Sequence, residues 1–101
     1  MIRHIVMFRF KEEAEGRKKV ENLEIAKKML EDLVGVVPTL ARMKVDLNSP
    51  KASQENYDLV LTSEYETMED LNAYIIHPAH KKVGEFMQTV RESRASIDFE
   101  V

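Results

Sequence analysis

The spacing of apolar residues changes several times along this chain, and the order of the changes limits the folds available to it. Residues 2–10 are dense in Ile, Val and Phe over a length typical of a strand. Residues 42–48, 56–65 and 95–101 alternate between apolar and polar side chains, as half-buried strands do. Two intervening stretches have the three-to-four-residue spacing of amphipathic helices. The order is therefore strand, helix, strand, strand, helix, strand.

The first helix is predicted over residues 12–34, because Gly35 and Pro38 follow it as stop signals. The second helix is predicted to begin near Met68, since residues 67–70 have the spacing of a capping box. This helix should break at Pro78, because the residue before a proline avoids the helical region. Pro78 itself suits the first position of a further helical segment.

This order of elements is that of the α+β, ferredoxin-like βαββαβ fold. It predicts a four-stranded antiparallel sheet with helices on one face and with the first and third strands at the centre. The chain has 101 residues and contains no repeat or Pro/Gly/Ser-rich linker, so we expect a single domain over residues 1–101.

The alternation within the strands also predicts which side of the sheet meets the helices. The apolar face expected to pack against the helices is made by Ile2, Val6, Phe8, Leu59, Leu61, Ile97 and Phe99. The opposite face is expected to have Ile5, Met7 and Val60 at its centre. The charged residues expected around that centre are Arg3, Arg9, Arg42, Lys44, Asp46, Asp58, Glu64, Asp98 and Glu100.

An apolar centre inside a charged rim is typical of a protein–protein interface. We therefore expect a homodimer in which the two sheets pack face to face, giving a dimeric α+β barrel. The alternative is a monomer with a few exposed apolar residues, which is common among globular proteins.

Composition excludes several classes of protein. The chain has no cysteine, so it has neither disulfides nor thiolate metal sites, and this is consistent with a cytoplasmic protein. Its net charge is −3 and its Lys and Arg residues are scattered, which argues against a nucleic-acid partner. No apolar run is long enough to span a bilayer, and Arg3, His4 and Arg9 interrupt the first apolar stretch, unlike a signal peptide. No membrane partner is expected.

Two histidines and a tyrosine are the candidates for chemistry. His80 lies in the first turn after Pro78, and His4 lies on the apolar side of the first strand. A histidine can act as a general base near neutral pH, and the hydroxyl of Tyr74 could donate a hydrogen bond to a developing enolate. In the alternative interpretation, His77 and His80 cap or brace the Pro78 turn, Tyr74 packs with a wet hydroxyl, and His4 is a satisfied core residue. Zinc bound by the three histidines would lack a fourth ligand.

We expect a cavity between the sheet and the helices, because an apolar site with a few convergent polar groups is the usual place for a ligand. Its expected lining residues are His4, Val6, Leu59, Leu61, Tyr74, Val83 and His80. In this cavity His80 is the candidate base and Tyr74 the candidate hydrogen-bond donor for a small-molecule ligand.

Three stretches of the chain resemble the stress-responsive A/B-barrel (Dabb) family. They are residues 3–10, residues 33–38, and residues 74–80 with Gly84 following. The most specific of them is the Tyr-x-x-His-Pro-x-His segment at residues 74–80. The resemblance implies a dimeric α+β barrel. Some members of the family are associated with stress or defence, and many have no assigned activity.

A plant branch of this family contains polyketide cyclases, which perform an intramolecular aldol condensation. The resemblance therefore implies, as an alternative function, a cofactor-independent enzyme with His80 as base and Tyr74 as hydrogen-bond donor. His4 would match a further histidine of the pocket. A monooxygenase is suggested only by analogy with other proteins of this fold.

The chain departs from those cyclases at several positions. Positions that are aromatic on the first helix of the cyclases match Ala26, Lys27 and Leu30 here. Arg91 and Arg94 stand where the cyclases have larger apolar groups. These replacements argue against a long apolar polyketide as the ligand.

The resemblance also implies a cation site where the first helix ends. Carbonyl groups there have no intrahelical partner and carry the negative end of the helix dipole. The matching residues are Val34, Val37 and Leu40, whose backbone carbonyls would bind Mg²⁺ or Na⁺. A water molecule or a simple cap at Gly35 is the alternative. No other cofactor is expected.

Overall fold

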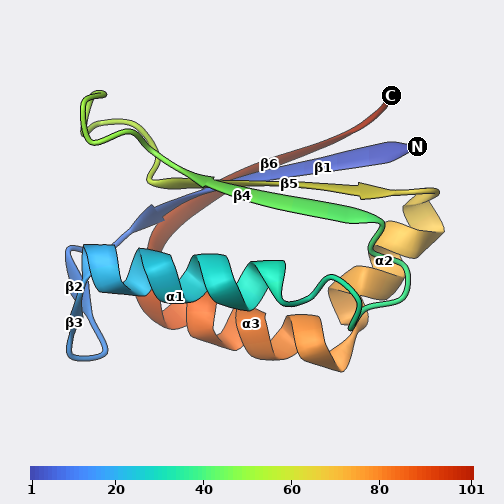
Figure 1. Ribbon diagram of the computed structural model, residues 1–101, viewed down its shortest axis with the longest axis horizontal. Coiled ribbons are helices and arrows are strands. Elements are labelled where there is room, and N and C mark those ends of the chain that lie inside the picture. The colour runs from blue at the N-terminus through green and yellow to red at the C-terminus, as the bar shows by residue number, and fades with distance from the viewer.

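Four antiparallel strands form one sheet, and helices cover one of its faces (Figure 1). The computed structural model describes residues 1–101. The strands of the sheet are β1 (Ile2–Phe10), β4 (Arg42–Leu47), β5 (Leu59–Tyr65) and β6 (Arg91–Glu100). The helices are α1 (Lys19–Glu31), α2 (Met68–Ile76) and α3 (Pro78–Val90), and a separate hairpin consists of β2 (Glu13–Ala14) and β3 (Arg17–Lys18).

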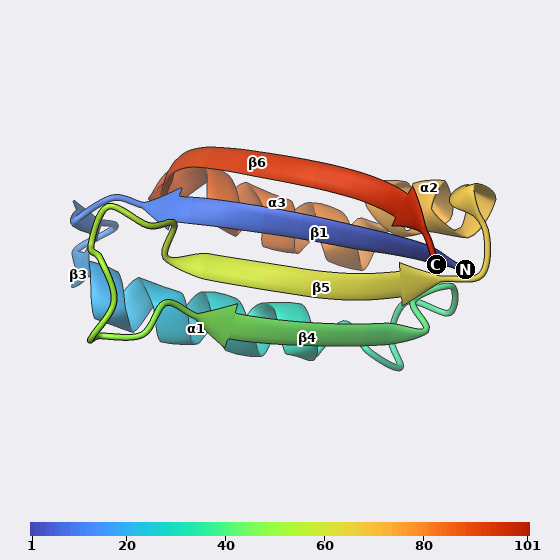
Figure 2. The ribbon, with the colours of Figure 1, turned by 90° about the horizontal axis from the view of Figure 1, so that it is seen from above.

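The strand order is β4-β5-β1-β6, so β1 and β5 are central, as the sequence predicted. Figure 2 shows the face that the helices leave open, with β4 and β6 at the two edges. The ferredoxin-like fold is thereby confirmed. Figure 2 also shows both chain termini at the same end of the sheet.

The hydrophobic core lies between the sheet and the helices. Val6 of β1 and Leu61 of β5 are buried there against Leu30 of α1 and Val83 and Met87 of α3. Each fully buried large aliphatic side chain contributes roughly 1.5–3 kcal/mol relative to an exposed one, which holds the helices to the sheet. None of the three helices is both long enough and apolar enough to cross a membrane.

The prediction that the first helix begins near residue 12 is wrong, because α1 begins at Lys19. The β2–β3 hairpin occupies the preceding residues. Its turn residues, Glu15 and Gly16, have φ angles of 55° and 73°. Two consecutive residues with positive φ form the tight turn that joins two antiparallel strands, and such residues cannot continue a helix.

Asn22 fixes this hairpin against α1. The side-chain amide of Asn22 donates to the Ala14 carbonyl at 3.1 Å, and its carbonyl oxygen accepts from Nε of Arg17 at 2.8 Å. Asn22 is fully buried, so both hydrogen bonds satisfy polar atoms that water does not reach. The hairpin is therefore an integral part of the fold and extends the layer of α1.

The last strand differs from the prediction in length and in the side that it presents. β6 begins at Arg91, directly after α3, rather than at residue 95. Ile97 pairs with Ile5 and Phe99 pairs with Arg3, and directly paired residues share one face of a sheet. Ile97 is 61% exposed and Phe99 is 37% exposed, because both lie on the open face. The prediction that they meet the helices is wrong.

Three acidic residues consequently lie elsewhere than predicted. Asp98 pairs with His4 and Glu100 pairs with Ile2, so both acidic residues lie on the helix side of the sheet. Asp58 precedes β5 and is buried. The prediction that these three residues belong to the rim of the open face is wrong.

The position of Asp58 follows from its hydrogen bonds. Its carboxylate accepts from the backbone amide of Phe10 at 2.8 Å and lies 3.4 Å from Nζ of Lys19. A buried carboxylate needs such partners to offset its loss of hydration. Asp58 therefore ties the end of β1 to the start of α1.

Candidate functional site

A cavity of about 210 Å³ lies between the central strands and the helices. Its thirteen lining residues are His4, Val6, Phe8, Leu30, Leu61, Tyr74, His80, Val83, Gly84, Met87, Gln88, Arg91 and Arg94. Six of the seven residues expected from the sequence are among them. The exception is Leu59, which pairs with Phe8 and is buried in the core without lining the cavity.

The break between α2 and α3 positions His80 and Tyr74 beside each other. The His77 side chain accepts a hydrogen bond from the backbone amide of Ala79 at 3.0 Å and so caps the start of α3. Pro78 follows at the first helical position. This turn brings the rings of Tyr74 and His80 to a centre-to-centre distance of 4.4 Å, with an angle of 51° between their planes.

His80 has one ring nitrogen engaged with the backbone. Its Nδ1 lies 2.9 Å from the carbonyl oxygen of Ile75, and because a carbonyl only accepts, Nδ1 carries the hydrogen. In the neutral ring Nε2 is then the basic nitrogen. Burial lowers the pKa of His80, an effect that the hydrogen bond to Ile75 opposes in part. His80 is therefore neutral at pH 7, and it both braces the helix junction and lines the cavity.

Tyr74 provides a hydroxyl that keeps its proton. The residue is buried, and its ring lies 5.2 Å from that of Tyr65, centre to centre. Burial raises the pKa of Tyr74, and the neighbouring Tyr65 raises it further. Burial likewise raises the pKa of Tyr65 to about 12, while its hydroxyl donates to Oγ of Ser63 at 3.0 Å. At neutral pH Tyr74 is thus a hydrogen-bond donor rather than a base.

His4 is oriented by Asp98, a partner that was not predicted from the sequence. The Nδ1 atom of His4 donates a hydrogen bond to the carboxylate of Asp98 on β6. A carboxylate accepts only, so Nδ1 carries the hydrogen and Nε2 is left as the second ring nitrogen. This pair could have been predicted if the register of β1 against β6 had been known, because His4 and Asp98 are paired in it.

The structure contains no cluster of three or more His, Cys, Asp or Glu side chains placed to hold a metal ion. One of the two ring nitrogens of His77, Nδ1, accepts the hydrogen bond that caps the start of α3.

The turn after α1 is held together largely by backbone hydrogen bonds. The Val37 carbonyl accepts from the Leu40 amide at 3.1 Å, and the Leu33 carbonyl accepts from the Val37 amide at 3.0 Å. Gly35 has a φ of 87°, which suits a glycine in this turn. A cation bound by the carbonyls of Val34, Val37 and Leu40 stays a prediction.

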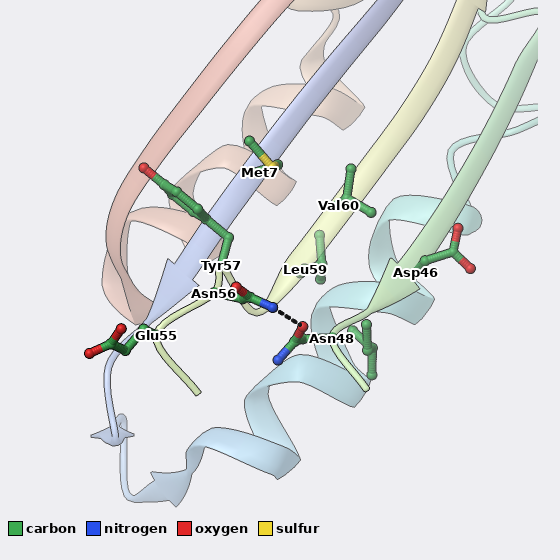
Figure 3. A pocket seen from close by; sticks show the side chains of 9 residues that line it. Met7, Asp46, Asn48, Glu55, Asn56, Tyr57, Leu59 and Val60 are labelled. Carbon is green, nitrogen blue, oxygen red and sulfur yellow. Dashed lines mark hydrogen bonds between the residues drawn. The ribbon is translucent and has the colours of Figure 1, made fainter. Parts of the chain in front are cut away.

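A second hollow, of about 450 Å³, lies on the open face of the sheet beneath the loop between β4 and β5 (Figure 3). Met7 and Val60 form part of its floor, and Tyr57 stands at its side (Figure 3). Asn56 donates to Asn48 at 3.2 Å across the loop. This hollow is larger than the cavity but contains none of the histidines, and its floor belongs to the apolar centre of the open face.

Comparison with known proteins shows that the chain matches the model of one protein family. The model of the stress responsive A/B barrel domain matches residues 2–101. Olivetolic acid cyclase from Cannabis sativa is 25% identical over 99 residues, which cover 97% of this chain and 94% of the cyclase. A stress-response A/B barrel domain-containing protein, DABB1, from Arabidopsis thaliana is 28% identical over 98% of this chain. The match spans only 46% of that relative's length.

Among solved structures, the chain is similar to a dimeric protein of unknown function with a ferredoxin-like fold from Bacteroides fragilis. The TM-score is 0.87 at 26% sequence identity, and the match covers 99% of this chain and 95% of the other. The similarity extends over the sheet, the helices and their connections, because almost the whole of each chain is aligned.

Proposed function

This chain belongs to the stress-responsive A/B barrel domain family, and on that premise we propose that it acts as a homodimer that binds a small organic molecule. The two sheets would pack face to face, and each subunit would hold its ligand in the cavity between sheet and helices. Residues 1–101 would form one domain.

One observation carries the ligand site: the neutral ring of His80 lies against the protonated hydroxyphenyl ring of Tyr74 at a cavity lined by both apolar and polar side chains. Two polar groups in defined protonation states can orient a ligand, while apolar walls contribute affinity. The residues come from β1, β5, α1, α2, α3 and β6. Such convergence of separate segments supports a binding site.

The open face of the sheet supports the homodimer. Met7, Ile97 and Phe99 are all exposed there in the single chain. Because Ile97 and Phe99 of β6 lie on this face, it has more apolar surface than was predicted from the sequence. An ion pair between Arg3 and Glu64, 2.7 Å apart, lies beside it. The Bacteroides fragilis protein of the same fold is a dimer. An apolar face left uncovered in a small domain favours association.

The test of the ligand site is a thermal-shift screen of small organic compounds against the wild-type protein and a Gly84→Leu variant. Gly84 lines the cavity, and a Cβ built there meets no atom within 4 Å, so a leucine is chosen at this position to place a larger side chain beside the cavity. Compounds that stabilise the wild type should not stabilise Gly84→Leu but should still stabilise Gly84→Ala, the matched control. Equal stabilisation of all three proteins would contradict the proposal.

A second candidate function is acid–base catalysis on a carbonyl compound. His80 Nε2 would remove a proton from the carbon next to a carbonyl, and the Tyr74 hydroxyl would donate a hydrogen bond to the enolate oxygen. In an aldol addition the enolate carbon then forms a bond to a second carbonyl carbon, and the resulting alkoxide takes the proton from His80 to give a β-hydroxy carbonyl compound. The orientation of His80 by Ile75, which leaves Nε2 basic, favours this candidate.

Proton exchange tests the catalytic step without requiring the natural substrate. Acetophenone in D₂O should exchange its methyl protons faster with the wild-type protein than with His80→Gln. The exchange is followed by ¹H NMR. Equal rates for the two proteins would contradict catalysis by His80 and leave the binding function standing.

A further inference from the structure

Two arginines lie at one end of the cavity, where α3 passes directly into β6. Arg91 is the first residue of β6, and Arg94 pairs with Phe8 of β1. Because paired residues share a face, the Arg94 side chain lies on the helix side of the sheet. Its guanidinium carbon is 6.0 Å from the centre of the Phe8 ring. Both arginines line the cavity.

Neither guanidinium has a carboxylate partner. The ion pairs of the structure all involve other residues. No Asp or Glu is among the thirteen residues that line the cavity. A guanidinium keeps its charge at any ordinary pH. The cavity lining therefore carries two guanidinium groups without a carboxylate partner, of which Arg94 is exposed to solvent, although the chain as a whole has a net charge of −3.

The positive charge extends to His80. The pKa of His80 is lowered first by burial, and electrostatic interactions with His4 and Arg94 add to this lowering. The charge of Arg94, which disfavours a protonated His80, would favour an anion in the cavity, whereas burial disfavours charge of either sign.

The remaining walls of the cavity are largely apolar. The apolar lining residues are Val6, Phe8, Leu30, Leu61, Val83 and Met87. A bare inorganic anion would gain nothing from them, whereas an organic acid would bury its hydrocarbon part. The volume of about 210 Å³ is below the roughly 300–1,000 Å³ of pockets for drug-sized ligands, which limits the ligand to a small molecule.

We propose that the cavity recognises a small organic acid, with its carboxylate at Arg91 and Arg94 and its apolar body extending toward Tyr74 and His80. This inference rests on the proposed function, since it names the class of ligand for the same cavity. Arginine presents paired N–H donors that match the two oxygens of a carboxylate. Gln88, in the last turns of α3, is a further polar group at this end.

Benzoate and benzamide form a matched pair of probes, because they have the same shape and differ in charge. Their binding is measured by NMR titration of the wild-type protein at pH 7, following the resonances of cavity residues such as Val83 and Gly84. Benzoate should bind about ten-fold or more tightly than benzamide, the difference expected for hydrogen bonds to a charged group. Inorganic phosphate, which lacks an apolar body, should bind more weakly than benzoate.

The variants locate the source of the preference. Arg91→Gln/Arg94→Gln should abolish the preference for benzoate over benzamide, and the single variant Arg94→Gln serves if the double variant fails to fold. Lys82→Gln removes the same charge from an exposed residue of α3 that does not line the cavity, and it should retain the preference.

Each remaining outcome overturns the inference. Equal affinities of the wild type for benzoate and benzamide would show a cavity that binds small molecules without recognising acids, so the proposed function would survive. Phosphate binding as tightly as benzoate would remove the role of the apolar walls. Benzoate that shifts no cavity resonance, while neutral compounds do, would exclude an acid as ligand. If no compound shifts these resonances, the proposed function fails as well.

Discussion

The imidazole of His4 donates a hydrogen bond through Nδ1 to the carboxylate of Asp98, although the two residues are 94 positions apart in the sequence. The pairing of β1 with β6 brings them face to face on the helix side of the sheet. His4 is buried and lines the cavity, whereas Asp98 lies at the exposed edge strand. The acidic residue thus fixes the orientation of a buried ring that belongs to the candidate site.

Asp98→Ala should destabilise the protein, because it leaves the buried Nδ1–H of His4 without a partner. A buried donor left unsatisfied costs about 1–3 kcal/mol. Glu92→Ala, an exposed carboxylate on the same strand with no ion pair, is the control and should change the free energy of unfolding by no more than about 0.5 kcal/mol. Urea denaturation measures both. Similar small effects for the two variants would contradict the structural role of Asp98.

Ile97→Lys should separate the proposed dimer without unfolding the subunit, because Ile97 lies on the open face and is 61% exposed in the single chain. A charge buried in the interface between two apolar surfaces is strongly unfavourable. Val20→Lys, at a residue of α1 that is 63% exposed on the helix side, is the matched control and should remain dimeric. Sedimentation and circular dichroism distinguish the outcomes. A wild-type protein that sediments as a monomer at micromolar concentration would refute the homodimer.

Gly84→Ala should stabilise the protein by about 0.5–1 kcal/mol, because alanine favours a helix interior and nothing lies within 4 Å of the added Cβ. Gly35→Ala has equal space around its Cβ but a φ of 87°, so it should destabilise the protein by about 1–2 kcal/mol. Thermal or urea denaturation of both variants gives the comparison. A loss of stability in Gly84→Ala would show that the glycine is needed for packing rather than for the opening of the cavity.

The protein should lose stability as pH falls below about 6.5, the ordinary pKa of histidine in an unfolded chain. Burial lowers the pKa of His80 in the folded state, so between the folded pKa and about 6.5 the unfolded chain binds more protons. The free energy of unfolding therefore rises with pH across this window. NMR titration of the His80 ring should give a midpoint below that of the urea-unfolded protein, and His80→Gln should reduce the pH dependence. A midpoint at or above the unfolded value would contradict the burial of His80.

Most of the fold could be predicted because each element has its own period and stop signal. Pro78 divides the second helical region where the structure divides it, and the alternation in β4 and β5 is preserved. The hairpin before α1 could not be predicted in the same way, since it depends on the tertiary contacts of Asn22 and on two residues with positive φ. Local spacing carries no information about such contacts.

The side presented by β6 could not be obtained from hydrophobicity alone. Ile97 and Phe99 alternate with polar residues, which fits a strand with either side turned to the helices. The register with β1 decides between the two, and it assigns the apolar side to the open face. The same register brings Asp98 to His4. For the cavity, the spacing around Pro78 was sufficient to place His80 and Tyr74 together.

The most direct test of a ligand cavity on the helix side of the sheet is NMR mapping of where small organic compounds bind. Methyl resonances of Leu61 and Val83 report on the cavity, and those of Met7 and Val60 report on the open face. A compound bound in the cavity should shift the resonances of Leu61 and Val83, give intermolecular NOEs to them, and leave those of Met7 and Val60 unchanged. Shifts confined to Met7 and Val60 would refute a ligand cavity on the helix side of the sheet.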